Sequence, residues 1–228
     1  MRAVLIWAFR LACLAGPAVQ AAGLPPVDAE LHHEQWEISR SGVTKSFRYD
    51  ERLIRRDGHL WSERLLPAAL SRLPRLSEAG GHKEFDLDGT SRHVSLDAAG
   101  QVQVEFVSRE RDLVVSVSPA EYESVAFVTS YAAAAALIDP AAVARMQPMK
   151  RASSVAGAHW REHLEAERYT RVLWSDALQI ALVLESGNTA GTQMARTVLK
   201  LLPKTPDLRL PWLGIERLPQ KDYADFSD

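Results

Sequence analysis

The chain has 228 residues, of which 46% are hydrophobic and 25% charged, and 27 Lys and Arg against 29 Asp and Glu give a formal net charge of −2. This balance is unlike the basic composition of nucleic-acid-binding proteins, so we expect no nucleic-acid partner. Cys13 is the single cysteine, which excludes an intramolecular disulfide. The length indicates one domain with a core of its own.

The N-terminal segment resembles a secretory signal peptide. Arg2 precedes an apolar run that ends at Gly16-Pro17, and Val19-Gln20-Ala21 has the small residues that signal peptidase reads. We therefore predict a signal peptide over residues 1–21 and a periplasmic protein. Arg10 interrupts the apolar run, which leaves two alternatives open, an uncleaved anchor and a lipoprotein acylated at Cys13. After residue 23 no apolar run is long enough to span a bilayer, so the protein is peripheral to a membrane at most.

Strand patterns dominate the first half of the predicted mature chain. Residues 23–28 are expected to be an extended leader, and residues 67–81 a short helix or an irregular loop. Turn signals at Asp57-Gly58, Asp88-Gly89 and residues 97–100 separate segments in which apolar and polar residues alternate. We predict strands over residues 46–53, 59–65, 91–96, 101–106 and 113–118, connected as an antiparallel meander with one buried face.

Helices and then further strands are expected in the second half. Ser118-Pro119-Ala120-Glu121 has the features of a helix start, and this helix is predicted to continue into Ala132–Ala136. Asp139-Pro140 predicts the start of a second helix. Strands are predicted over residues 169–174, 178–185 and 192–202. The Pro-rich segment 203–228 is expected to be strapped over the domain.

The motif His159-Trp160-Arg161-Glu162-His163 is the H-x-x-E-H pattern of some zinc peptidases, in which two His bind the metal and Glu acts as general base. That chemistry requires a helix, because only then do the two His share a face at short distance. On a strand, His159 and His163 would lie about 13 Å apart. The sequence favours neither structure over residues 158–168, and a zinc hydrolase is a remote alternative.

The other candidate motifs for metal binding or catalysis are weak signals. His32-His33-Glu34 would bind a metal only with a further ligand, and such a pair is more often solvent-exposed. The chain has no Gly-rich phosphate loop and no G-x-S-x-G or S-x-x-K motif, so we expect neither an enzyme nor a cofactor. Arginines from the strand region would form a basic stripe on one sheet face, either interleaved with acids or attracting an acidic partner or lipid headgroups: Arg48, Arg52, Arg55, Arg56 and Arg64.

Two stretches resemble the periplasmic MucB/RseB proteins of the LolA/LolB-like superfamily of lipoprotein carriers. The first runs from Phe47 to Arg52 and continues from Arg56 to Arg64; the second joins Val155-Ala156-Gly157 to residues 167–176. The resemblance implies an α+β fold over residues 22–202, in which a curved antiparallel sheet forms a half-open barrel with a few helices on its concave face. This chain departs from the family pattern at Leu178-Gln179, where Leu-Pro is usual. It is also expected to have one domain, whereas the sigma-factor regulators of the family carry a second.

Together these features predict a non-enzymatic periplasmic protein. It would bind a lipid acyl chain, a lipoprotein or an envelope protein in an apolar groove between the sheet and the Ala132–Ala136 helix. The alternative is an accessory or regulatory protein-interaction module of the envelope without a lipid ligand. The expected groove residues, each of which would serve equally well as ordinary core, are Phe47, Tyr49, Trp61, Val104, Phe106 and Trp174.

Overall fold

A computed structural model describes residues 23–66, 87, 89–127, 130–153, 155–203 and 209–226. The predicted signal peptide and the predicted helix or loop at residues 67–81 lie outside these ranges. No helix within them is long and apolar enough to cross a membrane.

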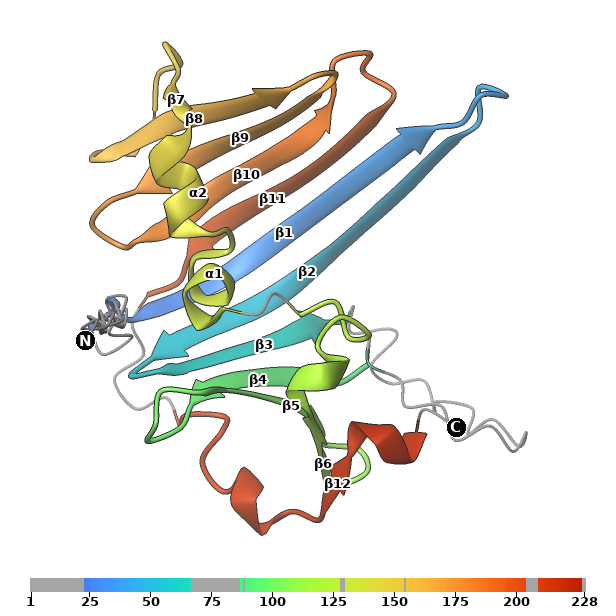
Figure 1. Cartoon of the computed structure of the whole chain (residues 1–228), viewed down its shortest axis with the longest axis vertical. Helices are drawn as coiled ribbons and strands as arrows, with labels where there is room; N and C mark the ends of the chain where they lie inside the picture. Colours follow the sequence, from blue (N-terminus) through green and yellow to red (C-terminus); the bar gives the residue numbers. More distant parts are fainter. Residues whose placement is uncertain are drawn as a thin grey trace, which may run out of the picture.

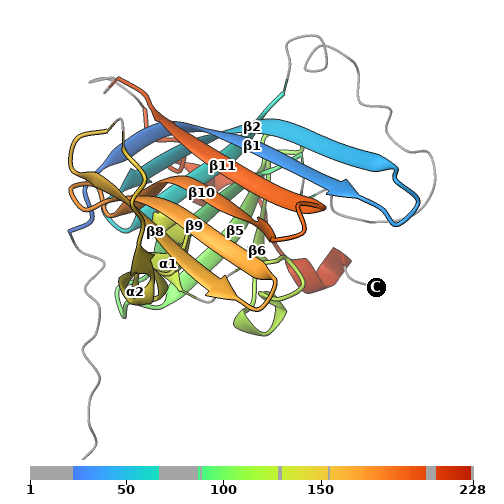
Figure 2. The ribbon, with the colours of Figure 1, turned by 90° about the horizontal axis from the view of Figure 1, so that it is seen from above.

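The described residues form one twelve-stranded, strongly curved and unclosed sheet (Figure 1, Figure 2). Every neighbouring pair is antiparallel except β12 and β6, which are parallel. The order across the sheet is β12-β6-β5-β4-β3-β2-β1-β11-β10-β9-β8-β7. The strands are β1 (Val27–Ile38), β2 (Thr44–Arg56), β3 (His59–Leu65), β4 (Ser91–Leu96), β5 (Val102–Ser108), β6 (Leu113–Val117), β7 (Gln147–Pro148), β8 (Ala158–Glu165), β9 (Arg168–Ser175), β10 (Ile180–Asn188), β11 (Gln193–Leu201) and β12 (Gln220–Asp222).

Pairing of β1 with β11 joins two antiparallel meanders into this one sheet, because β1 also pairs with β2 on its other side. The predicted strands are confirmed, and the open choice at residues 158–168 is settled as the strands β8 and β9 with a turn between them. The extended leader predicted over residues 23–28 is too long at its C-terminal end. Val27 already begins β1, which continues for twelve residues.

The helices are fewer and shorter than the sequence predicted. Ser118 and Glu121 form a capping box, but it closes only the 3-10 turn η1 (Pro119–Glu121). The Ala-rich helix α1 (Tyr131–Ala136) begins later, at the N-cap Ser130. Helix α2 (Pro140–Arg145) begins at Asp139-Pro140, as predicted. Both α-helices lie inside the curve of the sheet, so the fold is a sheet-dominated half-open barrel (Figure 2).

The concave face carries the main core. The register aligns apolar side chains from neighbouring strands in rows, and α1 with the segment around Tyr122 and Phe127 covers them. One row crosses the sheet at the level of α1, with Arg55 as its polar member: Val27, Arg55, Leu60, Val94, Val104 and Val117.

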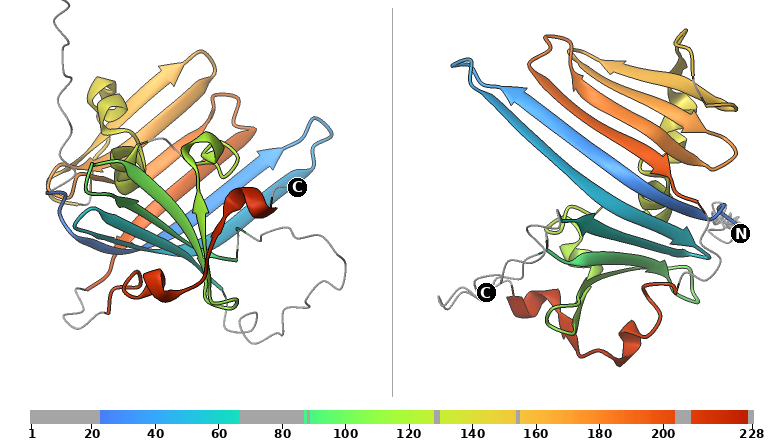
Figure 3. Two further views of the ribbon diagram at one scale, coloured as in Figure 1. Left: turned by 60° about the horizontal axis from the view of Figure 1, so that its bottom comes forward. Right: turned by 180° about the vertical axis from the view of Figure 1, so that it is seen from behind.

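A second core lies on the convex face, where the C-terminal segment packs against β2, β3, β5 and β6 (Figure 3). Trp212 and Ile215 of this segment contact a cluster that includes Ile54 and Trp61. The segment contains η2 (Ile215–Arg217), β12 and η3 (Tyr223–Phe226). Its residues 210–218 lie over the convex face, as the sequence predicted, whereas β12 extends the edge of the sheet beside β6, and Tyr223 and Phe226 pack against the main core. The domain boundary at residue 202 stays a prediction.

Candidate functional site

The concave face is filled at one end and open at the other. Where α1 packs, Ala133, Ala135 and Ala136 are buried against the sheet. Small side chains allow this close approach, so the space between the sheet and the Ala132–Ala136 helix, where a groove was expected, is occupied by packed side chains. The part of the concave face that no helix of the described chain covers lies farther along the strands, toward the β1–β2 hairpin (Figure 1).

Aromatic and polar side chains line this open end. His33 of β1 lies between Tyr49 of β2 and Thr197 of β11 in the cross-strand register. Phe47, one step nearer the hairpin tip, is 52% exposed. A shallow depression of about 150 Å³ is formed here, and its lining includes His33, Gln35, Phe47, Tyr49, Ala195 and Thr197. We call this region the open-end site.

Hydrogen bonds fix the floor of the open-end site. The His33 ring stacks on Tyr49 with a centroid distance of 4.4 Å. Its Nε2 lies 3.1 Å from Glu51 Oε2, and its Nδ1 lies 3.1 Å from the Thr197 hydroxyl. Burial alone would raise the pKa of Glu51, but hydrogen bonds from His33 and Ser62 together with the nearby charge of Arg92 hold it below its ordinary value. Glu51 is therefore a carboxylate at neutral pH.

A cation lies above the aromatic side chains. The Arg64 guanidinium carbon is 4.8 Å from the centroid of the Tyr49 ring and 5.4 Å from that of Phe47. These are cation–π distances, so the rings provide a platform for a planar charged group. The open-end site thus combines exposed aromatic surface with positive charge.

The six predicted groove residues fall into three places. Phe47 and Tyr49 lie at the open end. Val104 and Phe106 lie in the covered concave core, and Trp174 packs with residues of α2. Trp61 is on the convex face, because it pairs with Ile54 and lies beneath Trp212. That these residues line a ligand groove stays a prediction.

Arg55 links three segments of the chain at the end of the concave face that α1 fills. The sequence pattern places this residue in a basic stripe and gives no sign of that role. Arg55 is 1% exposed and donates all five of its N–H groups to backbone carbonyls. The acceptors belong to the N-terminal segment, the end of α1 and the β9–β10 turn: Pro25, Ala135, Leu178 and Gln179. Burial lowers the pKa of Arg55 to about 10, and burial likewise raises the pKa of neighbouring Tyr131 to about 12.

The other arginines of the predicted stripe do not share one face. Arg48 and Arg56 point to the convex side, where they pair with Glu34 at 2.6 Å and Asp28 at 2.5 Å. Arg64 points to the concave side, as the register with Glu51 requires. The stripe is thus split, and its convex part is interleaved with acids.

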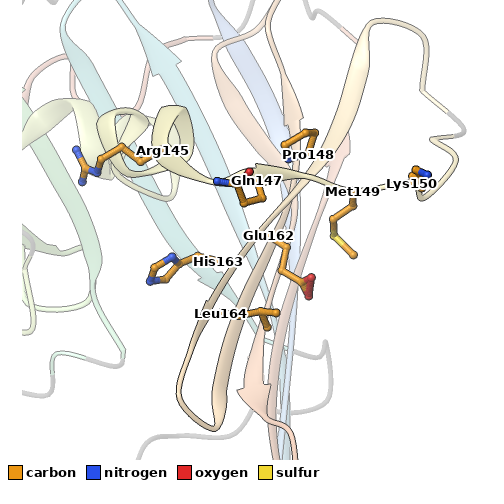
Figure 4. Close-up of a pocket in the computed structure, with 8 residues that line it drawn as sticks. All are labelled: Arg145, Gln147, Pro148, Met149, Lys150, Glu162, His163 and Leu164. Carbon is orange, nitrogen blue, oxygen red and sulfur yellow. The ribbon is translucent and has the colours of Figure 1, made fainter.

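The H-x-x-E-H motif lies on strand β8, not on a helix. His159 and His163 are four residues apart on an extended strand, which places them about 13 Å apart. Glu162 points to the opposite side from His163 (Figure 4) and forms an ion pair with Arg171 at 2.7 Å. The described residues contain no group of three or more side chains suited to hold a metal ion. The geometry that the zinc reading requires is therefore not formed at this motif.

The two histidines of the His32-His33-Glu34 motif, the other candidate metal site, lie on opposite faces of the sheet. His33 belongs to the concave open-end site, whereas His32 lies on the convex side with its Nδ1 2.5 Å from Asp50. Adjacent residues on a strand point in opposite directions, so these two rings cannot bind one metal ion.

A buried histidine pair lies on the convex face, under the C-terminal segment. His59 Nδ1 is 3.0 Å from His93 Nε2, and His93 Nδ1 is 2.9 Å from Glu105. The Trp212 indole stacks on both rings, with centroid distances of 5.1 and 5.8 Å. Burial, together with the nearby His93, lowers the pKa of His59. This cluster anchors the C-terminal segment.

A larger, open depression of about 450 Å³ lies at the sheet edge formed by β7 and β8 (Figure 4). Charged side chains of both signs line it together with Met149 and Leu164. Arg145, at the end of α2, contributes to one side. Its mixed lining and its position on a sheet edge distinguish it from the open-end site.

No family model matches this sequence, and no curated protein matches it. Similar solved structures include one of PNGF-II (9% identity, TM-score 0.38, covering 88% of this chain and 32% of that chain). Others are a DUF1329 family protein from Desulfovibrio piger (8%, 0.35, covering 84% and 92%) and a putative outer membrane lipoprotein-sorting protein domain from Vibrio parahaemolyticus (8%, 0.30, covering 79% and 88%). This chain spans about a third of the PNGF-II chain. TM-scores this low establish neither a family nor a function.

Proposed function

We propose that this is a non-enzymatic periplasmic protein that binds the apolar part of a lipid, a lipoprotein or an envelope protein at the open-end site. The observation that carries the proposal is the ring of Phe47, which is 52% exposed on a part of the concave face that no helix of the described chain covers (Figure 1). The signal-like N-terminus and the sequence resemblance to MucB/RseB proteins support the periplasmic location and the class of ligand.

The shape of the site favours an extended ligand. The depression of about 150 Å³ is smaller than the roughly 300–1,000 Å³ typical of pockets that enclose a drug-sized molecule. An alkyl chain or an extended peptide would lie along the strands and cover the exposed ring of Phe47. Burial of apolar surface at about 25 cal/mol per Å² would drive this association.

Native mass spectrometry of the protein purified from periplasm tests the proposal, because one spectrum reports the processed N-terminus and any bound molecule. A lipid-sized adduct on a chain that starts near Ala22 is the expected result. The matched variant Phe47→Ser should lose the adduct, whereas Leu213→Ser, an exposed apolar residue of the C-terminal segment, should retain it. A wild-type chain with neither adduct nor affinity for hydrophobic probes would refute the proposal.

A second candidate function is an accessory module that binds another envelope protein, and the sheet edge at β8 favours it. Short β7 covers β8 only at Arg161 and Glu162. Met149 donates to the Trp160 carbonyl on that side, so the alternation of a strand directs the Leu164 N–H to the same edge. Leu164 is 59% exposed and borders the depression of Figure 4. Such an edge is suited to accept an added strand.

This second function predicts a polypeptide adduct of fixed stoichiometry in the same spectrum. Leu164→Pro removes the outward N–H without removing a donor to β9, and it should abolish the adduct. Phe47→Ser should leave it intact. If neither variant changes the adduct, the edge of β8 is not its binding site.

A further inference from the structure

We infer that the ligand of the open-end site is an amphiphile with an anionic headgroup, which Arg64 and Arg92 bind while its alkyl chain lies against Phe47. This inference rests on the proposed function, since it names the chemistry of the ligand at that same site. Its basis is a pair of arginines that faces a single carboxylate, beside a part of the concave face that no helix of the described chain covers (Figure 1).

The register brings the two arginines together. Arg64 of β3 lies opposite Glu51 of β2, and Arg92 of β4 lies opposite Ser62, two residues from Arg64 on the same face. Diagonal neighbours of this kind have side chains rooted about 7–8 Å apart. Both arginines are half-buried at the border between the covered core and the open end. A phosphate or carboxylate between them would reach both guanidinium groups.

The nearby carboxylate offsets part of this charge, because the positive charge of Arg92 helps to hold the pKa of Glu51 below its ordinary value. Glu51 accepts hydrogen bonds from His33 and Ser62, and no ion pair links it to Arg64 or Arg92 in the described part of the chain. On the convex face, by contrast, several arginines form ion pairs with acids within 3.0 Å. Examples are Arg48 with Glu34, Arg56 with Asp28, Arg151 with Glu185 and Arg171 with Glu162. Among the described residues, two guanidinium groups thus face one carboxylate at this place on the concave side.

The aromatic platform places the headgroup relative to the chain. The Arg64 guanidinium lies over the Tyr49 and Phe47 rings, and no ion pair with a carboxylate engages it in the described part of the chain. A guanidinium held in this way presents its donors to two oxygens of one anion. The same rings extend from Arg64 toward the hairpin tip, so an alkyl chain attached to the anion would follow them. The charge complementarity thus commits the site to an anionic amphiphile in preference to an uncharged one.

Titration calorimetry with three probes tests this inference: decyl phosphate, decyl maltoside and inorganic phosphate, all below any micellar concentration. Wild-type protein should bind decyl phosphate at least about tenfold more tightly than decyl maltoside, as one charge-assisted contact would produce. Inorganic phosphate should bind far more weakly than decyl phosphate. Arg64→Gln combined with Arg92→Gln should reduce the preference to within about twofold, whereas Arg48→Gln on the convex face should preserve it.

The outcomes distinguish a failure of the anionic-headgroup inference from a failure of the proposed function. Equal affinity of the wild type for both decyl compounds would overturn the anionic headgroup and leave the proposed function standing. Binding of neither would overturn both. Equal affinity for inorganic and decyl phosphate would indicate a free-anion site and also overturn the inference. If the double variant is unfolded by circular dichroism, the single variant Arg64→Gln carries the same test, since Arg64 lies at the rim.

Discussion

Arg55 gives the sharpest prediction about stability, because its side chain joins three parts of the chain. The substitution Arg55→Met keeps a long apolar stem but removes all five hydrogen bonds to backbone carbonyls. Hydrogen bonds from a charged group contribute about 1.5–3 kcal/mol each, and the lower value gives a loss of about 7 kcal/mol for the five. The acceptors are also left without a partner in a buried location.

Removal of the buried positive charge offsets part of this loss of stability. Burial lowers the pKa of Arg55 from 12.5 to about 10, which corresponds to roughly 3 kcal/mol against the charged form. The net expectation is a fall of about 4 kcal/mol in the free energy of unfolding. For a chain of this size that lowers the melting temperature by roughly 8–16 °C.

Urea unfolding followed by tryptophan fluorescence measures this change by linear extrapolation. Arg48→Met is the matched control, because Arg48 is an exposed arginine of the same strand that pairs with Glu34. Loss of this exposed ion pair should lower the free energy of unfolding by less than about 1 kcal/mol. If Arg55→Met unfolds within 1 kcal/mol of the wild type, the reasoning about the buried guanidinium is wrong.

Three further predictions concern the C-terminal segment and the open end. Trp212→Ala should lower the free energy of unfolding by about 3 kcal/mol in the same urea assay, because the indole is buried on the histidine pair; an unchanged midpoint would contradict that anchor. Since the folded state lowers the pKa of His59, the folded chain binds fewer protons there than the unfolded chain, so stability should fall as pH drops below about 6.5. His59→Gln should flatten this part of the pH profile, and a profile identical to that of the wild type would argue against the assignment. Phe47→Ser should leave the melting temperature within about 1 °C, because this side chain is already half-exposed, while binding of a fluorescent apolar probe weakens; unchanged probe binding would count against the open-end site.

The parts of the fold that local pattern predicted are those with one buried and one solvated face. Strand β5 alternates over residues 102–106, because Val104 and Phe106 lie in the concave core while Gln103 is exposed and Glu105 half-buried on the other face. Strand β1 was not predicted, because it lacks such an alternation of apolar and polar residues. At its open end, where no helix covers the sheet, His32 and His33 are polar on both faces, so alternation disappears. The missing pattern was itself a consequence of the uncovered surface.

The helices show how tertiary context overrides propensity. Five consecutive alanines from Ala132 favour a long helix, yet α1 has six residues and ends at Leu137 in a left-handed conformation. The chain must turn there so that α2 can pack on Val172 and Trp174. A local sequence pattern does not contain that requirement.

The composition of the candidate site was only partly accessible from the sequence. Phe47 and Tyr49 were recognised from their alternation, and the structure places both at the open end. His33, Thr197 and Arg64 join them through long-range pairing of β11, β1, β2 and β3, which depends on register across the whole sheet. Trp61 was assigned to the same groove because an aromatic residue on a strand does not reveal which face is concave.

The most direct test of the central claim is photo-crosslinking with a fatty acid that carries a diazirine near the middle of its chain, followed by peptide mapping. The account predicts labelling concentrated on β2 around Phe47 and Tyr49, with the adjoining residues of β1 and β11, and competition by unlabelled decyl phosphate. Labelling confined to the convex face, to the C-terminal segment around Trp212 or to the edge of β8 would contradict it.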